Sequence, residues 1–253
     1  MKIFSGFNTF YLFGLLISFS SNASAETAKI AVASNFTGAA HELQHAFEAK
    51  TSHKLLLSFG STGKLTTQIL YGAPYAAFLA ADLSHPEKIA AAELAKPGTL
   101  FTYASGELVL FRKPNSGNGR ELSIVDALKS AKRIAIANPA SAPYGQAAYS
   151  VLTHLDMWEA AQSKLVRGGN IAQTYQFAIT GNVDLAFVAK SQVIKNKPST
   201  YWSLPKETYP PLKQGAILLT KGQENKAAIE FLDFLKTEPA LEIISSHGYD
   251  RRE

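Results

Sequence analysis

The stretch KIAVASNFTGAA, residues 29–40, decides the fold. It opens with a largely apolar run of strand length that ends at Ala33, Ser34 and Asn35 then occupy a turn, and a helix begins directly after them. The stretch LLLSFGSTGKLTTQIL, residues 55–70, repeats this order of strand, turn and helix. Strands that run straight into helices are typical of an α/β protein with mainly parallel sheets flanked by helices.

Outward from these two units, strand-length apolar runs alternate with helix-period stretches through most of the chain. This alternation again favours mainly parallel sheets. The expected strands are 29–33, 54–58, 76–80, 107–111, 133–137, 165–167, 183–189 and 216–220. Two helices over 225–236 and 239–247 are expected to close the chain, and Gly248 stops the second one.

Two of the runs look like crossover strands that form a hinge. The run 106–111 precedes a point where the α/β pattern starts afresh, and the run 214–220 leads into the two closing helices. We therefore expect two lobes: residues 26–106 and 214–253 form lobe one, and residues 107–213 form lobe two. In such a protein the ligand is expected in the cleft, at the carboxyl ends of strands where helices begin.

Residues 1–25 have the pattern of a secretory signal peptide. Lys2 provides the positive start, FYLFGLLISF at 10–19 is a short apolar run, and NASA at 22–25 supplies the small residues of a cleavage site. The chain contains no cysteine, so it has neither a disulfide nor a thiol for lipid attachment. We interpret the product as a soluble periplasmic protein that is exported by a cleavable signal.

The net charge of +5 is modest and is not concentrated in one stretch. The densest basic segments are short, as at 195–197 and 251–252. A nucleic-acid groove would need clustered basic residues interleaved with exposed aromatic ones, so we expect no nucleic-acid partner.

HELQH, residues 41–45, matches the H-E-x-x-H signature of helical zinc sites in hydrolases. Projected at 100° per residue, the buried stripe of this helix runs through Leu43, which places His41 and His45 on the opposite, solvent side. The third ligand is also missing, because Glu48 and Thr51 stand where the extended motif needs glycine and histidine. No metal site is expected, and a zinc hydrolase is the least favoured alternative.

Four turns between a strand and a helix supply neutral hydrogen-bond donors. Ser34 and Asn35 lie in the first and Ser61 in the second, where the first N–H groups of a helix point outward. The turn in 137–148 offers Tyr144, through its backbone N–H or its hydroxyl, and the turn in 166–178 offers the N–H of Ile171. Each turn alone is also compatible with ordinary helix capping.

Such donors suit an oxyanion, which would gain hydrogen bonds and the positive ends of several helix dipoles together. No base, nucleophile or metal cluster accompanies the turns, so the pattern favours capture of a ligand over an enzymatic reaction. The P-loop motif that GSTGK at 60–64 suggests is incomplete, since Ser58 and Leu65 occupy positions that need glycine and a hydroxyl residue.

Six stretches, in their order and spacing, resemble the periplasmic molybdate-binding proteins of ABC transporters. They are VASNFTGAA (32–40), SFGSTGKLTTQILYGAPYAAFLAAD (58–82), SGELVLF (105–111), IAIANPASAPYGQAA (134–148), GNIAQTYQFAITGNVDLAFVAKSQ (169–192) and AIEFLDFLKTEPALEIISSHGY (228–249). The resemblance implies the type II fold of periplasmic binding proteins, closing over molybdate or tungstate without a cofactor. It also implies a membrane permease as partner, and we expect a monomer.

The resemblance further implies that Ser34, Asn35, Ser61, Tyr144 and Ile171 bind the ligand. Some family members place a tyrosine hydroxyl on the anion at the position of Ala189, which here is left as a second-line residue. In this chain Asn35 is expected to replace that hydroxyl. Tetrahedral dianions share charge and geometry, so another oxyanion such as sulfate or phosphate stays an alternative, and molybdate is not ranked against tungstate.

Overall fold

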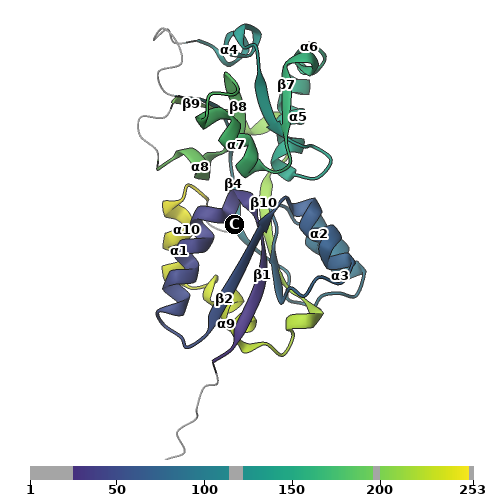
Figure 1. The fold of residues 1–253 in the computed structure, drawn as a ribbon, viewed down its shortest axis with the longest axis vertical. Coiled ribbons are helices and arrows are strands. Elements are labelled where there is room, and N and C mark those ends of the chain that lie inside the picture. The colour runs from purple at the N-terminus through teal and green to yellow at the C-terminus, as the bar shows by residue number, and fades with distance from the viewer. Residues whose placement is uncertain (1–24, 114–121, 196–199, 251–253) are drawn as a thin grey trace, which may run out of the picture.

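The strands form two separate five-stranded sheets in a computed structural model that describes residues 25–113, 122–195 and 200–250 (Figure 1). The first sheet has the order β2-β1-β3-β10-β4, and the second has the order β7-β6-β8-β5-β9. The first contains β1 (Thr27–Ala33), β2 (Lys54–Gly60), β3 (Ala77–Leu79), β4 (Phe101–Gly106) and β10 (Leu212–Leu218). The second contains β5 (Leu108–Arg112), β6 (Ile134–Ala137), β7 (Leu165–Gly168), β8 (Leu185–Ala189) and β9 (Thr200–Ser203).

Helices cover both faces of each sheet, as the βα alternation predicts. Around the first sheet lie α1 (Thr37–Glu48), α9 (Lys226–Phe234) and α10 (Glu238–Ser246) on one face, and α2 (Thr62–Leu70) and α3 (Ser84–Ala91) on the other. Around the second lie α4 (Ile124–Ser130), α5 (Pro143–His154) and α6 (Trp158–Ala161) on one face, and α7 (Ile171–Ile179) and α8 (Lys190–Val193) on the other. We call the two sheet-and-helix bodies lobe one and lobe two.

Both sheets are mixed, whereas the sequence favoured mainly parallel ones. β1 pairs in parallel with β2 and β3, but β10 is antiparallel to β3 and β4. In lobe two β6 pairs in parallel with β7 and β8, but β5 is antiparallel to β8 and β9. The reason is connectivity: β5 and β10 are the strands by which the chain enters one lobe and returns to the other.

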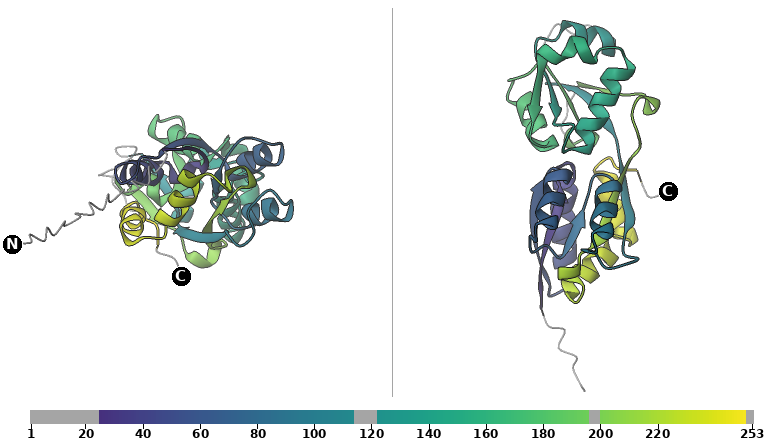
Figure 2. Two further views of the ribbon diagram at one scale, coloured as in Figure 1. Left: turned by 90° about the horizontal axis from the view of Figure 1, so that it is seen from below. Right: turned by 90° about the vertical axis from the view of Figure 1, so that its right-hand side faces the viewer.

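The hinge lies along one side of the molecule, where the chain crosses between the lobes (Figure 2). β4 ends at Gly106 and β5 begins at Leu108, so a single residue separates the two sheets on the way out. The return path leads from β9 into β10. The predicted lobe boundaries after residues 106 and 213 stay a proposal, and the predicted signal peptide falls on residues that, up to 24, lie outside the described ranges.

Several strand boundaries differ from the expected ones. β4 and β9 were not expected, since FTYASG and TYWS lack the long apolar run of a central strand. β10 begins at Leu212 and ends at Leu218, and Thr220, expected as its last residue, begins a short 3-10 turn, Thr220–Gly222. These strands are edges or hinge segments, so partners far away in the sequence determine their pairing.

Each lobe is held by its own apolar core. In lobe one the stripe of α1 packs against the aromatic residues of α9, with Leu43, Phe47 and Phe231 all buried. Full burial of a side chain of this size contributes about 1.5–3 kcal/mol. Helix α10 ends at Ser246, and Gly248 just beyond it has a φ of +80°, the left-handed conformation expected of a glycine after a helix. No helix in the described ranges is long and apolar enough to cross a membrane.

Candidate functional site

A small cavity lies between the two lobes, where the strands of both sheets end and helices begin. Its cavity volume is about 10 Å³. Its lining residues are Ala33, Ser34, Asn35, Gly60, Ser61, Thr62, Ala81, Ala142, Pro143, Tyr144 and Ile171. The structure thus brings together the five residues that the sequence singled out as ligand donors, and none of the described residues in this lining carries a charge.

Four helix starts converge on the cavity. Lobe one contributes the short 3-10 helix η1 (Ser34–Phe36), which runs into α1, and α2, which follows its N-cap Ser61. Lobe two contributes α5, with Pro143 in its first turn, and α7, which follows its N-cap Asn170. The first N–H groups of a helix lack partners within it, and its N-terminus carries a partial positive charge. The cavity is therefore a place for an anion, built from peptide groups.

Among the lining residues, Ser61 gives the clearest indication that a hydrogen-bonding ligand belongs in the cavity. It is 3% exposed, and its Oγ has no hydrogen-bond partner among the described residues. The neighbouring Thr62 differs from it, because its Oγ1 accepts a bond from the N–H of Ala81 at 3.1 Å. Buried polar atoms are nearly always satisfied, so the hydroxyl of Ser61 is available to a ligand in the cavity.

The side chain of Asn35 does not face the cavity as a free donor. Its Nδ2 donates to Oε1 of Gln214 at 2.9 Å and to the hydroxyl of Tyr249 at 3.1 Å. This differs from the expectation that its amide would replace the tyrosine hydroxyl missing at Ala189. The backbone N–H of Asn35, at the start of η1, is the group left for a ligand.

The sequence left open whether Tyr144 would face the cavity with its backbone N–H or with its hydroxyl. Its hydroxyl points to the hinge, where it accepts a bond from Nε2 of Gln214 at 3.3 Å. Burial raises the pKa of this hydroxyl well above its ordinary value of 10.0, so it stays neutral. The backbone N–H of Tyr144 lies in the first turn of α5, where N–H groups lack partners within the helix.

Ile171 begins α7 and offers its backbone N–H, while the side chain of Asn170 caps the helix by accepting from the N–H of Gln173 at 2.9 Å. Ala189 is not among the lining residues. Ala189 is connected to the lining residue Ile171 through Gln192. The N–H of Ala189 donates to Oε1 of Gln192 at 2.9 Å, and Nε2 of Gln192 donates to the carbonyl of Ile171 at 3.1 Å. Gln192 thus joins the end of β8 to the start of α7.

The lobes touch one another around the cavity, so the structure is a closed form. The N–H of Gly63 in lobe one donates to the carbonyl of Ser141 in lobe two at 2.9 Å. On the opposite side, Oγ of Ser191 in lobe two donates to the carbonyl of Asn35 at 3.0 Å. A ligand in the cavity would be enclosed between these contacts.

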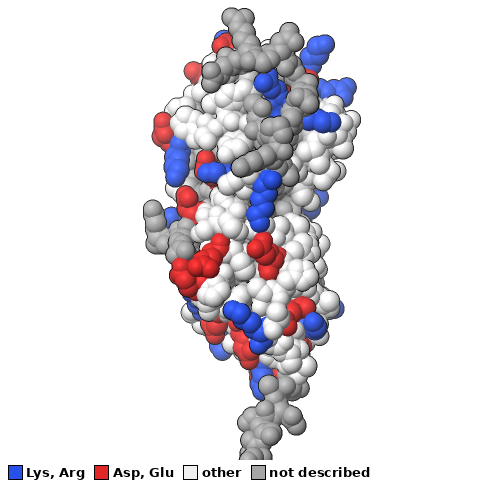
Figure 3. All heavy atoms as spheres, turned by 90° about the vertical axis from the view of Figure 1, so that its left-hand side faces the viewer, with Lys and Arg blue, Asp and Glu red and all other residues white. Residues whose placement is uncertain are grey.

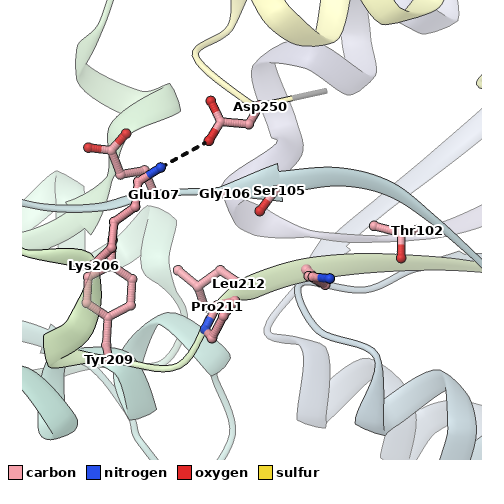
Figure 4. A pocket seen from close by; sticks show the side chains of 10 residues that line it. Thr102, Ser105, Gly106, Glu107, Lys206, Tyr209, Pro211, Leu212 and Asp250 are labelled. Atoms are coloured by element: carbon pink, nitrogen blue, oxygen red, sulfur yellow. Dashed lines mark ion pairs between the residues drawn. The ribbon is translucent and has the colours of Figure 1, made fainter. Parts of the chain in front are cut away.

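A second, larger pocket lies beside the hinge strands and is a poor place for an anion (Figure 4). It is lined in part by the carboxylates of Glu107 and Asp250, and Asp250 forms an ion pair with Lys206 at 3.6 Å. Lys206 and Lys213 also line the pocket, so the two carboxylates leave it without a net positive charge, and no helix of eight or more residues begins among its lining residues. Size alone therefore does not identify the site.

The histidines of HELQH are exposed, as their helical position predicts. The ring of His41 lies 5.1 Å from that of Phe59, between centroids. In the described ranges, no group of three or more His, Cys, Asp or Glu side chains is arranged to hold a metal ion. Basic and acidic side chains are interspersed over the face shown in Figure 3, without one large patch of a single sign.

Sequence reasoning missed three residues of the site and its surroundings. Thr62 lines the cavity, and its place directly after Ser61 in the same turn was a usable signal. Gln214 and Tyr249 hold Asn35 from behind. Their only sequence signal is a polar residue at the start of an otherwise apolar run and a tyrosine after the last helix.

Comparison with known proteins gives a consistent picture. Residues 28–250 match the model of a family described as bacterial extracellular solute-binding protein. The chain is 45% identical to the molybdate-binding protein ModA of Rhodobacter capsulatus over 219 residues, which cover 87% of this chain and 86% of that protein. It is also 45% identical to the ModA protein of Azotobacter vinelandii over 231 residues, covering 90% and 91%.

Solved structures agree with the sequence comparison. The periplasmic molybdate-binding protein of Azotobacter vinelandii matches with a TM-score of 0.84 at 35% identity, covering 89% of this chain and 100% of that one. This confirms the two-lobed fold expected from the sequence. The sulfate-binding protein SubI of Mycobacterium tuberculosis H37Rv matches with a TM-score of 0.71 at 14% identity, covering 90% and 88%, and shows a shared fold alone.

Proposed function

The chain belongs to the bacterial extracellular solute-binding proteins, and we propose that it captures molybdate in the cavity between its lobes and delivers it to the membrane permease of an ABC transporter. Relatives at 45% identity over most of the chain are molybdate-binding proteins. We place the protein in the periplasm, after removal of residues 1–25 as a signal peptide. Its role is transport of a solute and not an enzymatic reaction.

One observation carries the proposal: the hydroxyl of Ser61 is buried without a partner in a cavity that four helix starts surround. The proposed donors are this hydroxyl, the hydroxyl of Ser34, and the backbone N–H groups of Asn35, Tyr144 and Ile171. Each hydrogen bond to a charged partner contributes about 1.5–3 kcal/mol. About five to seven such bonds are enough for a submicromolar complex after the entropy of association is subtracted.

Tungstate is proposed as a second ligand, because it has the same charge and tetrahedral shape as molybdate. Hydrogen phosphate fits less well. It carries a proton that needs an acceptor, and the described lining of the cavity contains no carboxylate. Sulfate is fully deprotonated, so it is the alternative that the donor set alone does not reject.

A panel of anions tests the proposal. The protein is titrated calorimetrically with molybdate, tungstate, sulfate, phosphate and chromate, and its melting temperature is followed with each. A ligand at a thousandfold excess over its Kd stabilises the folded state by about 4 kcal/mol, so molybdate is expected to raise the melting temperature clearly. If sulfate alone raised it, the protein would be a sulfate carrier.

A further inference from the structure

Gln214 stands out as a buried polar residue in the hinge, behind the proposed anion site. It lies on β10 with 0% exposure, where the pairing with β4 shifts register between Gln214 and Gly215. Burial of an amide without hydrogen bonds is strongly unfavourable. A glutamine in this place therefore depends on the groups that its amide contacts.

The amide of Gln214 contacts both lobes at once. Its Oε1 accepts from Nδ2 of Asn35 and from the hydroxyl of Tyr103, each at 2.9 Å, and both donors belong to lobe one. Its Nε2 donates to the hydroxyl of Tyr144, which belongs to lobe two, at 3.3 Å. Asn35 and Tyr144 are the residues whose backbone N–H groups line opposite walls of the cavity.

A second set of bonds holds Asn35 from the other direction. The hydroxyl of Tyr249 lies 2.7 Å from the carbonyl oxygen of Asn35 and 3.0 Å from Oγ of Ser191, which comes from lobe two. Ser191 in turn donates to the same carbonyl of Asn35. The carbonyl of Asn35 thus contacts lobe two directly through Ser191, and its amide contacts Gln214, which in turn contacts Tyr144 of lobe two.

The network is neutral as well as buried. Burial raises the pKa values of Tyr103, Tyr144 and Tyr249 above the ordinary value of 10.0. No fixed charge of this network therefore stands behind the cavity to attract or repel an anion. Its contribution to binding must be geometric, through the positions of the N–H groups and of the lobes.

We propose that Gln214 is a positioning residue that couples closure of the lobes to anion binding, by holding Asn35 and Tyr144 in register across the hinge. It does not touch the ligand. Opening of the lobes moves Tyr144 away from lobe one, so the amide loses its bond to the other lobe, and closure restores it. This inference rests on the proposed anion site.

Two tyrosine variants separate this role from a merely structural one. Tyr144→Phe removes the bond that Gln214 makes to lobe two, while the backbone N–H of residue 144 is kept. Tyr103→Phe removes a bond of the same amide within lobe one and serves as the matched control. We expect Tyr144→Phe to raise the Kd for molybdate roughly fivefold to tenfold through faster dissociation, and Tyr103→Phe to change the Kd less than about twofold.

Gln214→Leu removes the whole set of bonds at similar volume and is expected to weaken binding at least as much as Tyr144→Phe. A variant that combines Gln214→Leu with Tyr144→Phe should lose less binding free energy than the sum of the two single losses, because both changes remove the same Gln214–Tyr144 hydrogen bond. The chain has no cysteine, so Lys50→Cys and Lys129→Cys introduce one label in each lobe. Fluorescence transfer between the labels should report a smaller closed fraction in Gln214→Leu at subsaturating molybdate.

The results distinguish this inference from the proposed function. Wild-type protein that fails to bind molybdate would remove the proposed function itself. Wild-type protein that binds, with unchanged dissociation rates and unchanged label distances in Tyr144→Phe and Gln214→Leu, would overturn the positioning role alone. Equal losses in Tyr103→Phe and Tyr144→Phe would also overturn it, because the effect would then reflect the folding of lobe one.

Discussion

Ser61 illustrates how single residues of this site work through position and not through charge. Its hydroxyl is buried, lacks a partner in the described ranges, and lies at the N-cap of α2 beside the free N–H groups of that helix. A hydroxyl of this kind costs free energy in the empty protein and regains it when an anion oxygen accepts its proton. It should therefore matter for binding and little for folding.

Ser61→Ala is expected to raise the Kd for molybdate roughly tenfold or more, from the loss of one charge-assisted hydrogen bond. The melting temperature of the ligand-free protein should stay the same or rise. Ser245→Ala is the matched control, since Oγ of Ser245 is also buried without a partner but lies on α10, away from the cavity. Calorimetric titration of both variants with molybdate makes the comparison.

Gly63 offers a test in which affinity and stability should move in opposite directions. A Cβ at this position would lie 2.9 Å from the carbonyl oxygen of Ser141, so the close approach of the two lobes would be disturbed. Alanine within α2 favours the helix by about 1 kcal/mol relative to glycine. Gly63→Ala should therefore raise the melting temperature of ligand-free protein and weaken molybdate binding; a variant with unchanged affinity would show that this interlobe contact is dispensable.

At the residue level the sequence located the site but not the orientation of every side chain. Ser34, Ser61 and Ile171 follow from turns between a strand and a helix, which are local patterns. The directions of the Asn35 amide and the Tyr144 hydroxyl depend on Gln214, which is 179 and 70 residues away. Pairings over such distances leave no local signal in a single sequence.

Among the elements, α1 links the two lobes at its exposed side. Glu42 on this helix pairs with Lys195, which follows α8 in lobe two, at 3.2 Å, and with His247 at the end of α10 at 2.7 Å. The hydrogen bond from His247, followed by the bond and charge of Lys195, holds the pKa of Glu42 below its ordinary value of 4.5. The glutamate of HELQH is thus part of an interlobe ion pair.

The pH dependence of stability follows from this lowered pKa. A carboxylate with a depressed pKa in the folded state contributes stability that is fully present above about pH 4.5 and is lost as the pH falls below it. The side chain of Glu42 is half exposed, so the contribution should be less than about 1 kcal/mol. Glu42→Gln should reduce the fall of the melting temperature with decreasing pH below pH 4.5. Glu242→Gln, a change at an exposed residue of α10, should leave the dependence of the melting temperature on pH as it is in the wild type.

The strands show where sequence patterns stop being informative. β1 and β2 were each predicted to within two residues at one end, because both contain an apolar run that stops at a turn before a helix. β4 was missed, and β10 begins earlier than expected, because their register depends on each other across the hinge. The mixed order of the sheets has the same origin, since the direction of β5 and β10 is set by the path between the lobes.

At the scale of the whole molecule, two lysines without an ion pair among the described residues lie near the start of α2. Lys64 and Lys88 from lobe one line a groove there together with Ser141 from lobe two. Cationic walls raise the local concentration of an anion and speed its association, and salt screens the effect. The motif GSTGK thus supplies a lysine near the site without forming a phosphate-binding loop.

Lys64→Gln is expected to slow association of molybdate by a few-fold at low ionic strength and to leave dissociation nearly unchanged. The difference from wild type should vanish as salt is added, because the Debye length shrinks to about 3 Å at 1 M. Lys129→Gln on α4, far from the cavity in lobe two, provides the control (Figure 1). Stopped-flow measurements that showed a change in dissociation alone would instead make Lys64 a ligand contact.

The lining of the cavity has one more consequence, which concerns protons. Among its described residues no side chain titrates near neutrality, since the tyrosine that borders it is neutral over the whole physiological range. Binding of the anion should therefore neither take up nor release protons. The binding enthalpy measured by calorimetry should be the same in buffers of different ionisation enthalpy, once buffer effects on the free anion are subtracted. Titration of the cavity wall is therefore not expected to release the anion, and separation of the two lobes is the step expected to do so.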